Sequence, residues 1–441
     1  MRKALLTYQE YKDSGLAWLG SIPSDWSIAR NKEIFKERGS VSNTGKETLL
    51  TVSHITGVTP RSEKNVNMFM AETMEGYKIC HEGDLIINTM WAWMGALGTS
   101  NELGICSPSY NVYMPQKGIP YNRRYFDYLF RIPNAVMEMT RNSKGIVSSR
   151  LRLYAKDFFQ IETVLPSLEE QEAIAHYLDT KTAQIDRKID LLTQKAQRYE
   201  ELKRSLINET VTRGLDKSVP MKDSEIEWIG EIPKHWEVQR LKDLANIQNS
   251  NVDKKSHLNE IPIKLCNYVD VYKNDFIDSS LDFMEATATK DEIKKFRIEE
   301  GDVFITKDSE TCDDIAIPAL ARETFESVIC GYHLAQIRVK PKKLLGAYLF
   351  RLFQSERYGS RFVVSAKGIT RVGLGQSAIS DTLTPIPPLN EQKAIAHYLD
   401  TKTAQIDQII QTINTQIEKL QELRKTLIND VVTGKIKVID N

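Results

Sequence analysis

Several residue types and motifs are scarce or missing in this chain of 441 residues, and each shortage excludes a class of protein. The cysteines are few, odd in number and never spaced as C-x-x-C, which argues against a disulfide framework or a cysteine-rich zinc site and favours a reducing cytoplasm. The longest apolar window, residues 85–98, is interrupted by Asn88 and Thr89, so it is too short to span a bilayer. The first ten residues contain no apolar run of the length that a secretion signal needs, so we expect none. The cysteines are Cys80, Cys106, Cys266, Cys312 and Cys330.

Catalytic motifs and a charge excess are missing as well. The Gly-Lys pair at 45–46 is followed by Glu47 rather than by serine or threonine, so it does not fit a phosphate-binding loop. A G-x-G-x-x-A pattern at 373–378 lacks the strong strand before it and the long helix after it that a dinucleotide site needs. G-x-S-x-G and H-E-x-x-H do not occur. The net charge is zero, so any basic surface must be local.

The chain does contain an internal repeat. The letters AIAHYLDTKTAQID occupy residues 173–186 and again 394–407, 221 positions later. A shorter pattern, W-x-G-x-I-P-x-x-W, occurs at 18–26 and 228–236, and we call these two segments the straps. The favoured interpretation is that each strap packs on its own domain through its tryptophans, and the alternative is a docking patch for a partner.

Each long repeat opens a predicted helix, over residues 168–212 and 389–433. Apolar residues recur there every seven positions, which is typical of a long helix that packs as a coiled coil. The first helix is about 67 Å long at 1.5 Å per residue. We expect this seam to pair the two helices and to dock a partner. The seam residues are Leu178, Ile185, Leu192, Tyr199 and Leu206 in the first copy and Leu399, Ile406, Ile413, Leu420 and Leu427 in the second.

The helix ends carry capping signals, and the duplication predicts a geometry. We expect Ser167 with Glu170 to cap one start and Asn390 the other, and Gly214 and Gly434 to mark the two ends. Two equivalent units in one chain commonly relate by a pseudo-twofold axis. That axis makes the helices antiparallel and places the globular regions at opposite ends.

Between each strap and each helix lies a region of about 140 residues that mixes strand-like alternation with short helical patterns. The two regions are much less alike than their flanks. We predict an α+β fold: two globular α+β domains joined by two long antiparallel coiled-coil helices. The predicted segments are a first strap and domain at 1–166, a central helix at 167–214, a second strap and domain at 215–387, and a C-terminal helix and tail at 388–441.

One constellation in the repeat resembles a metal site. Glu172, His176 and Asp179 share a helical face at i, i+4 and i+7. The second copy has Lys393 in place of the glutamate, and a cation does not ligate a metal. We therefore favour structural roles for these residues and predict neither a metal site nor a catalytic residue.

Two basic stretches stand at corresponding places in the globular regions. Residues 117–156 hold nine basic residues against two acidic ones, and residues 338–371 hold nine against one. In each, arginine follows a Lys-Gly pair, and such loops bring backbone to phosphates and arginine to base edges. A solvated face balanced by acids elsewhere is the alternative, but the recurrence favours DNA. The candidate residues are Lys144, Gly145, Arg150, Arg152, Lys367, Gly368, Thr370 and Arg371, with the strand-end residues Asn88, Thr89, Lys307 and Ser309 as weaker candidates.

Together these features resemble the specificity subunit of bacterial type I restriction–modification systems. The resemblance rests on the straps and on the pattern P-x-L-x-E-Q-x-A-I-A-x-Y-L-D-x-x-T-x-x-I-D that opens each helix. It implies that each globular region is a target recognition domain that reads one half of a bipartite, asymmetric DNA target. It further implies that the helices set the spacer and dock two methyltransferase subunits, with endonuclease/translocase subunits joining for restriction. S-adenosylmethionine, ATP and magnesium would then be bound by those partners, and this chain would hold no cofactor.

Two other hypotheses stay open at the level of the sequence. The first is a fused DNA methyltransferase or nuclease with a cryptic active site, which needs a nucleotide or S-adenosylmethionine pocket. The second is a structural adaptor without DNA contact. We also expect Trp91 and Trp93 to pack in the core rather than to wedge against bases.

Overall fold

A computed structural model describes residues 7–64, 72–147 and 150–438 of the chain. The chain divides into two compact units. Unit 1 comprises residues 1–192 and 415–441, and unit 2 comprises residues 193–414. Both boundaries fall inside long helices, so each unit contains the start of one long helix and the end of the other.

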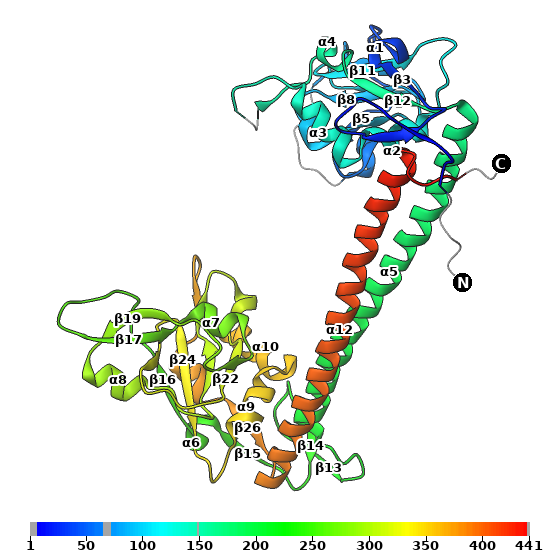
Figure 1. Cartoon of the computed structure of the whole chain (residues 1–441). Coiled ribbons are helices and arrows are strands. Elements are labelled where there is room, and N and C mark those ends of the chain that lie inside the picture. Colours follow the sequence, from blue (N-terminus) through cyan, green and yellow to red (C-terminus); the bar gives the residue numbers. More distant parts are fainter. Residues whose placement is uncertain (1–6, 65–71, 148–149, 439–441) are drawn as a thin grey trace. The chain divides into compact units, whose positions relative to one another are not determined.

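Unit 1 is built on an antiparallel four-stranded sheet in the order β4-β11-β8-β9. Two further strand pairs, β5-β6 and β7-β10, and the helices α2 and α3 surround it (Figure 1). The sheet strands are β4 (Phe35–Glu37), β8 (Leu85–Asn88), β9 (Leu97–Thr99) and β11 (Tyr110–Pro115). The other strands are β1 (Tyr11–Asp13), β2 (Ser21–Pro23), β3 (Ser27–Arg30), β5 (Leu50–Ser53), β6 (Gly57–Pro60), β7 (Lys78–Cys80), β10 (Gly104–Cys106) and β12 (Glu162–Leu165). The short helices are α1 (Asn31–Ile34), α2 (Arg123–Phe130), α3 (Pro133–Arg141) and α4 (Ala155–Phe158).

Unit 2 is built on a five-stranded sheet in the order β16-β24-β20-β22-β18, beside a three-stranded sheet β19-β17-β23. The sheet strands are β16 (Ala245–Asn249), β17 (Ile261–Cys266), β18 (Phe276–Ile277), β19 (Met284–Ala288), β20 (Val303–Thr306), β22 (Pro318–Ala321), β23 (Val328–Cys330) and β24 (Leu334–Val339). The paired strands outside them are β13 (Met221–Asp223), β14 (Glu231–Pro233), β15 (Glu237–Arg240), β21 (Asp308–Ser309), β25 (Val372–Gly373) and β26 (Leu383–Ile386). The short helices are α6 (Leu241–Leu244), α7 (Tyr268–Lys273), α8 (Lys290–Phe296), α9 (Gly346–Phe353), α10 (Glu356–Ser365) and α11 (Gln376–Ser380).

The two long helices are α5 (Leu168–Arg213) and α12 (Leu389–Val432), each within one residue of its predicted end. In unit 1 the first part of α5 lies along the last part of α12, and Arg424 Nε is 2.9 Å from Asp186 Oδ1. In unit 2 Lys203 Nζ is 2.8 Å from Asp407 Oδ1. The second ion pair is the first one shifted by the 221-residue repeat. The pairing is therefore antiparallel and repeats in both units, as the duplication predicted.

The long helices complete the core of each unit. In unit 1 Leu178 of α5 and Val432 of α12 lie in the same hydrophobic cluster as Trp26. In unit 2 Leu399 of α12 and Val211 of α5 share a cluster with the second strap. The predicted seam residues are buried or half-buried along both helices, and both straps pack on their own units. We call the globular part of each unit, without the long helices, its head. A head without the two helix parts would lack part of its hydrophobic core.

The helix ends match the capping signals in part. Ser167 Oγ accepts from the backbone nitrogen of Glu170 at 3.2 Å, but the Glu170 side chain turns to the strap, so the box is half formed. The cap predicted for Asn390 is wrong, because α12 already begins at Leu389. Gly214 and Gly434 follow the helix ends with φ of +74° and +77°, which glycine adopts without strain. No helix in the described ranges is both long and apolar enough to cross a membrane.

Candidate nucleic-acid interface and helix joints

The second tryptophan of each strap donates to the first turn of a long helix. Trp26 Nε1 lies 2.7 Å from Glu170 Oε2 in unit 1, and Trp236 Nε1 lies 3.1 Å from Glu391 Oε1 in unit 2. The Tyr8 hydroxyl also donates to Glu170. Burial raises the pKa of Glu170, and the hydrogen bonds from Tyr8 and Trp26 oppose that rise. The glutamate of the repeated E-Q pair therefore fastens the strap to the helix in both units.

The glutamine of the same E-Q pair holds the backbone of the globular region. Gln171 Oε1 accepts from the backbone nitrogen of Asn122 at 2.8 Å, and Gln392 Oε1 accepts from that of Leu345 at 2.8 Å. Each glutamine also donates to the carbonyl oxygen two residues before that nitrogen, at 3.1 and 3.0 Å respectively. Both side chains are buried. The joint therefore depends on main-chain groups of the head.

In each unit, a tyrosine of the head donates to the long helix that ends in that unit, which is α12 in unit 1 and α5 in unit 2. The Tyr125 hydroxyl donates to the carbonyl oxygen of Val432 at 3.2 Å, and the Tyr348 hydroxyl donates to that of Val211 at 3.2 Å. The two valines are 221 residues apart, as the repeat requires. Equivalent joints thus connect the two unlike globular parts to the helices.

The histidine–aspartate constellation of the repeat is structural. Asp179 pairs with Arg124 and accepts from the Tyr128 hydroxyl at 2.8 Å, and Asp400 accepts from Arg351 Nη2 at 2.6 Å. Burial raises the pKa of Asp179, but the bonds from Arg124 and Tyr128 outweigh it and hold that pKa below its ordinary value. The repeated histidines are exposed. Within the described ranges no group of three or more His, Cys, Asp or Glu side chains is placed to hold a metal.

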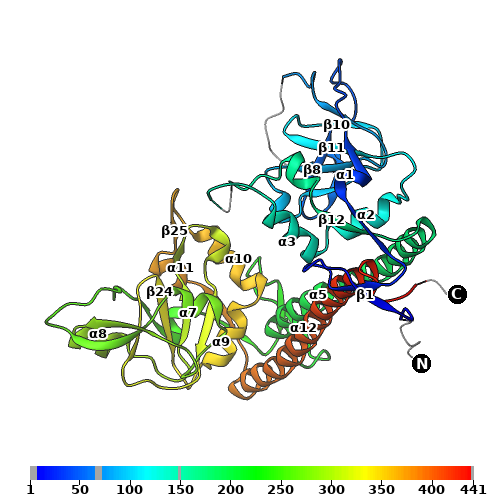
Figure 2. The same ribbon diagram turned by 45° about the horizontal axis from the view of Figure 1, so that its top comes forward.

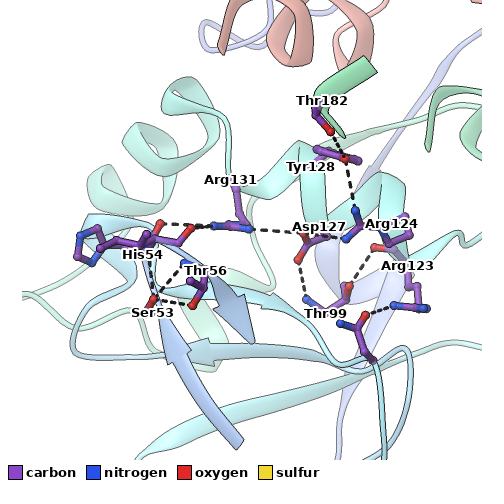
Figure 3. Close-up of polar contacts among 12 residues, drawn as sticks. Ser53, His54, Thr56, Thr99, Arg123, Arg124, Asp127, Tyr128, Arg131 and Thr182 are labelled. Atoms are coloured by element: carbon purple, nitrogen blue, oxygen red, sulfur yellow. Dashed lines mark hydrogen bonds and ion pairs between the residues drawn. The ribbon is translucent and has the colours of Figure 1, made fainter. Parts of the chain in front are cut away.

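Figure 3 shows how unit 1 fixes several of its arginines in place. Asp127 accepts from the backbone nitrogen of Thr99 at 3.0 Å and pairs with Arg131 at 3.6 Å. Arg131 Nη2 donates in turn to the carbonyl oxygen of Ile55 at 2.7 Å. A cavity of about 220 Å³ lies beside this network and extends to Arg424 of α12. The bonds of Arg131 therefore connect segments of the head, and those of Arg124 connect the head to α5.

The Lys-Gly pairs lie in two corresponding loops, each closed by paired backbone hydrogen bonds. In unit 1 the nitrogen and oxygen of Lys144 bond those of Arg152, both at 2.9 Å. In unit 2 Lys367 bonds Gly373 in the same way, at 3.0 and 2.9 Å. We call these segments, residues 144–152 and 367–373, the basic loops. Residues 148 and 149 of the first lie outside the described part of the chain.

Glycine is required at the second position of each basic loop. A Cβ on Gly145 would lie 2.8 Å from the carbonyl oxygen of Arg150, and one on Gly368 would lie 1.8 Å from that of Arg371. Gly368 also has φ of +141°, a conformation that L residues rarely adopt. The glycines shape the loops, and the arginines and Lys367 are exposed around them.

Two of the strand-end candidates form backbone hydrogen bonds to the residue that follows each basic loop. The carbonyl oxygen of Thr89 accepts from the backbone nitrogen of Leu153 at 3.0 Å, and that of Lys307 accepts from Leu374 at 2.7 Å. The other two strand-end candidates, Asn88 and Ser309, are buried. The structure therefore brings all four strand-end candidates next to the loops.

Comparison with known proteins agrees with this architecture. A family model described as the type I restriction modification DNA specificity domain matches residues 233–419. The specificity subunit of the type I restriction enzyme MjaVIII from Methanocaldococcus jannaschii is 25% identical over 330 residues, which cover 74% of this chain and 73% of that protein. The MjaIX specificity subunit of the same organism is 24% identical over 449 residues, which cover 97% of both chains. The chain is thus similar to type I restriction specificity subunits along nearly its whole length.

Solved structures show the same fold. A chain from a structure of a type I restriction–modification system superposes with a TM-score of 0.69 at 15% identity, and the match covers 93% of this chain and 98% of that chain. The α+β domains joined by long helices are thus a fold that the two chains share. The hypothesis of a fused methyltransferase or nuclease finds no support in these relatives.

The basic stretches are only partly available to a ligand. Eight of their eighteen cations pair with carboxylates of their own unit. The paired residues are Arg123, Arg124, Arg131, Arg141 and Lys144 in unit 1 and Arg338, Arg351 and Arg371 in unit 2. The count of basic residues in the sequence therefore overstates the positive charge that these two stretches offer to a ligand.

Sequence reasoning missed a charged cluster beside the second basic loop. Asp308 pairs with His333, with Lys307 Nζ at 3.0 Å and with Arg371 Nε at 3.2 Å. His333 has φ of +73°, which is uncommon for a residue with a side chain. Burial lowers the pKa of His333 and Asp308 opposes that shift. The cluster fixes the direction of Arg371, and the wide spacing of its members in the sequence gives no signal.

The prediction that Trp91 packs in the core is wrong, since the side chain is 50% exposed. Trp93 is half-buried and its Nε1 donates to the carbonyl oxygen of Met90 at 3.0 Å. The left-handed Gly95 ends the short turn that carries both tryptophans, and this turn directs Trp91 outward. Trp91 follows Thr89 by two residues, and the carbonyl oxygen of Thr89 accepts from Leu153, the residue after the first basic loop.

Proposed function

We propose that this chain reads a bipartite, asymmetric DNA target for a type I restriction–modification complex. Each head reads one half of the target through its basic loop and the adjacent strand end. The long helices set the gap between the halves. The complex uses this reading for both methylation and restriction.

The joints carry this proposal. The same letters of α5 and α12 hold two unlike heads through equivalent contacts of Glu170 and Glu391, of Gln171 and Gln392, and of two tyrosines. Two equivalent joints are expected where one kind of partner binds the chain twice. Two different heads are expected where each one binds a different DNA sequence. An adaptor without DNA contact leaves the difference between the heads without a purpose.

The outer faces of the helices are the docking sites for two methyltransferase subunits. The seam itself is occupied by helix pairing, so the partner needs other residues. Leu202 and Leu423 occupy equivalent positions of the repeat and are both exposed, so each unit presents one of them. Endonuclease/translocase subunits join the complex for restriction. The chain itself is non-catalytic, works in the cytoplasm, and leaves S-adenosylmethionine, ATP and magnesium to those partners.

Binding and methylation assays on the complex with its methyltransferase test this proposal. Modified-base sequencing of cells that express both proteins should reveal a two-part methylated motif. The affinity of the purified complex for a duplex with that motif should fall steeply with salt, because each neutralised phosphate releases counterions. Weak binding with a flat salt response contradicts DNA reading. Methylation or cleavage by this chain alone contradicts a non-catalytic role.

A pair of variants assigns the reading to the basic loops. Arg371→Ala should weaken target binding by about 1–3 kcal/mol if the guanidinium contacts a base. Arg213→Ala is the matched control, because the side chains of Arg213 and Arg371 are 52% and 53% exposed and each pairs with one carboxylate. Equal affinities of the two variants would remove Arg371 from the reading surface.

A further inference from the structure

Both basic loops present the same apolar residue to solvent. Both basic loops begin with the triplet Lys-Gly-Ile, at 144–146 and at 367–369, although the two globular parts otherwise differ; the same triplet also occurs at 117–119, outside the loops. Ile146 is 104% exposed and Ile369 is 105% exposed. Among the large apolar side chains of the described residues, only Leu258 is as exposed, at 105%. Two unlike heads therefore place a bare isoleucine at the same point of the same loop.

The loops hold these side chains away from their own units. The closing hydrogen bonds of Lys144 and Lys367 and the tight turn at each glycine fix the residue that follows. Figure 2 shows the segment around β25, which includes the second loop, as a narrow projection from unit 2. Burying an isoleucine is worth about 1.5–3 kcal/mol, and neither isoleucine obtains that stabilisation within its own unit.

The surroundings of the two isoleucines are cationic. Exposed Arg150 and Arg152 follow the first, and exposed Lys367 and Arg371 flank the second. An apolar tip with cations on its own loop matches a polyanion with an apolar interior. Duplex DNA has this build, with phosphates outside and stacked bases inside, and proteins insert isoleucine and similar residues between its base steps. A purely apolar protein partner offers nothing to the cations.

We propose that Ile146 and Ile369 are wedges that enter the DNA, one in each half of the target, and pack against the bases while the neighbouring cations hold the phosphates. This inference rests on the proposed function and adds to it. The bases contacted by the wedge are unstacked at one step, so sequences that unstack readily are preferred there. Each isoleucine thereby contributes to specificity without a hydrogen bond to a base edge.

Salt titrations separate a wedge from a phosphate contact. The complex of the full chain with its methyltransferase is titrated with a duplex that carries the methylated motif. Ile369→Ala and Ile146→Ala should each weaken binding by about tenfold, with an unchanged salt slope, because the side chain is apolar. Lys367→Ala should lower the slope by about one. Leu258→Ala, the equally exposed control, should bind as the wild type does, and Ile369→Leu should keep most of the affinity.

A fluorescent base locates each wedge. The adenine analogue 2-aminopurine, placed at successive steps of the duplex, brightens when it is unstacked. The wild-type complex should show one bright step in each half, with Ile369→Ala silencing one half and Ile146→Ala the other.

Three outcomes overturn the wedge. They are wild-type affinity of both alanine variants, loss of salt slope in them, and loss of methyltransferase binding in place of DNA binding. If the wild-type complex itself shows no steep salt response, the proposed function fails before the wedge is in question.

Discussion

The strap–helix joint predicts an unequal response of the two units to the same substitution. Glu170→Ala in unit 1 removes the acceptor of both Tyr8 and Trp26. Glu391→Ala in unit 2 removes the acceptor of Trp236 and of His235, whose Nε2 lies 2.8 Å away. The two glutamates hold equivalent places in the repeat, so each variant is the control of the other.

The expected magnitudes follow from burial. A hydrogen bond to a charged group contributes about 1.5–3 kcal/mol, and Glu170 accepts two inside the core of unit 1. Burial raises the pKa of Glu170, so part of this gain is offset by the cost of the buried charge. We expect Glu170→Ala to cost about 2–4 kcal/mol. The His235 side chain is 44% exposed and regains water, so Glu391→Ala should cost about 1–2 kcal/mol.

Hydrogen exchange read by mass spectrometry measures each unit separately, which a single melting curve of two units does not. Protection of the unit 1 peptides should fall in Glu170→Ala, and that of the unit 2 peptides should fall less in Glu391→Ala. Glu170→Gln keeps an acceptor without the charge and should lose less than the alanine variant. Unchanged unit 1 protection in Glu170→Ala, or a larger loss in Glu391→Ala, would refute the reasoning.

Three further predictions concern the helix ends, pH and the spacer. Gly434→Ala should lower the free energy of unfolding of unit 1 by about 2–4 kcal/mol, because the added Cβ would lie 2.3 Å from Pro23 Cδ and alanine would be strained at this φ. Gly20→Ala is the control, since its φ of +70° is similar and the space around it is open. It should cost about 1 kcal/mol in the same exchange assay. Burial depresses the pKa of His333, so its contribution to stability is present above its ordinary pKa of about 6.5 and is lost as pH falls through the depressed value; the wild-type Tm should therefore drop more between pH 7.5 and 5.5 than that of His333→Asn, and equal drops would contradict this. Inserting seven helical residues after both Leu192 and Asn414 should lengthen the helix pair by about 10 Å, or about 3 base pairs at 3.4 Å each; an unchanged gap in the methylated motif would exclude the helices as the spacer.

The sequence predicted the parts of this protein in which apolar residues recur at a regular spacing. The long helices follow a seven-residue repeat in two copies, and their observed bounds differ from the predicted ones by one residue at most. The mixture of strand-like and helical patterns predicted the α+β domains, which contain strands such as β8 and β24. Asn390 failed as a cap since a capping residue type does not by itself fix where the first turn starts.

The parts that the sequence did not predict depend on contacts between distant residues. Asp308, His333 and Arg371 are 25 and 38 positions apart, and no local pattern connects them. The ion pairs that occupy much of the basic stretches are equally non-local, so the charge count overstated the available surface. The exposure of Trp91 depends on the turn at Gly95, which propensity does not reveal.

The joints have a consequence for how such proteins diversify. Gln171 and Gln392 grip main-chain nitrogen and oxygen atoms of the heads, and every amino-acid sequence supplies those atoms. Because these two glutamines bind backbone atoms, the side chains of the head can change while the joint is kept. Heads can therefore be exchanged between chains as interchangeable parts while the helices stay the same. A small stock of heads then yields a much larger number of pairwise combinations, and each combination is a new target sequence for an unchanged set of partners.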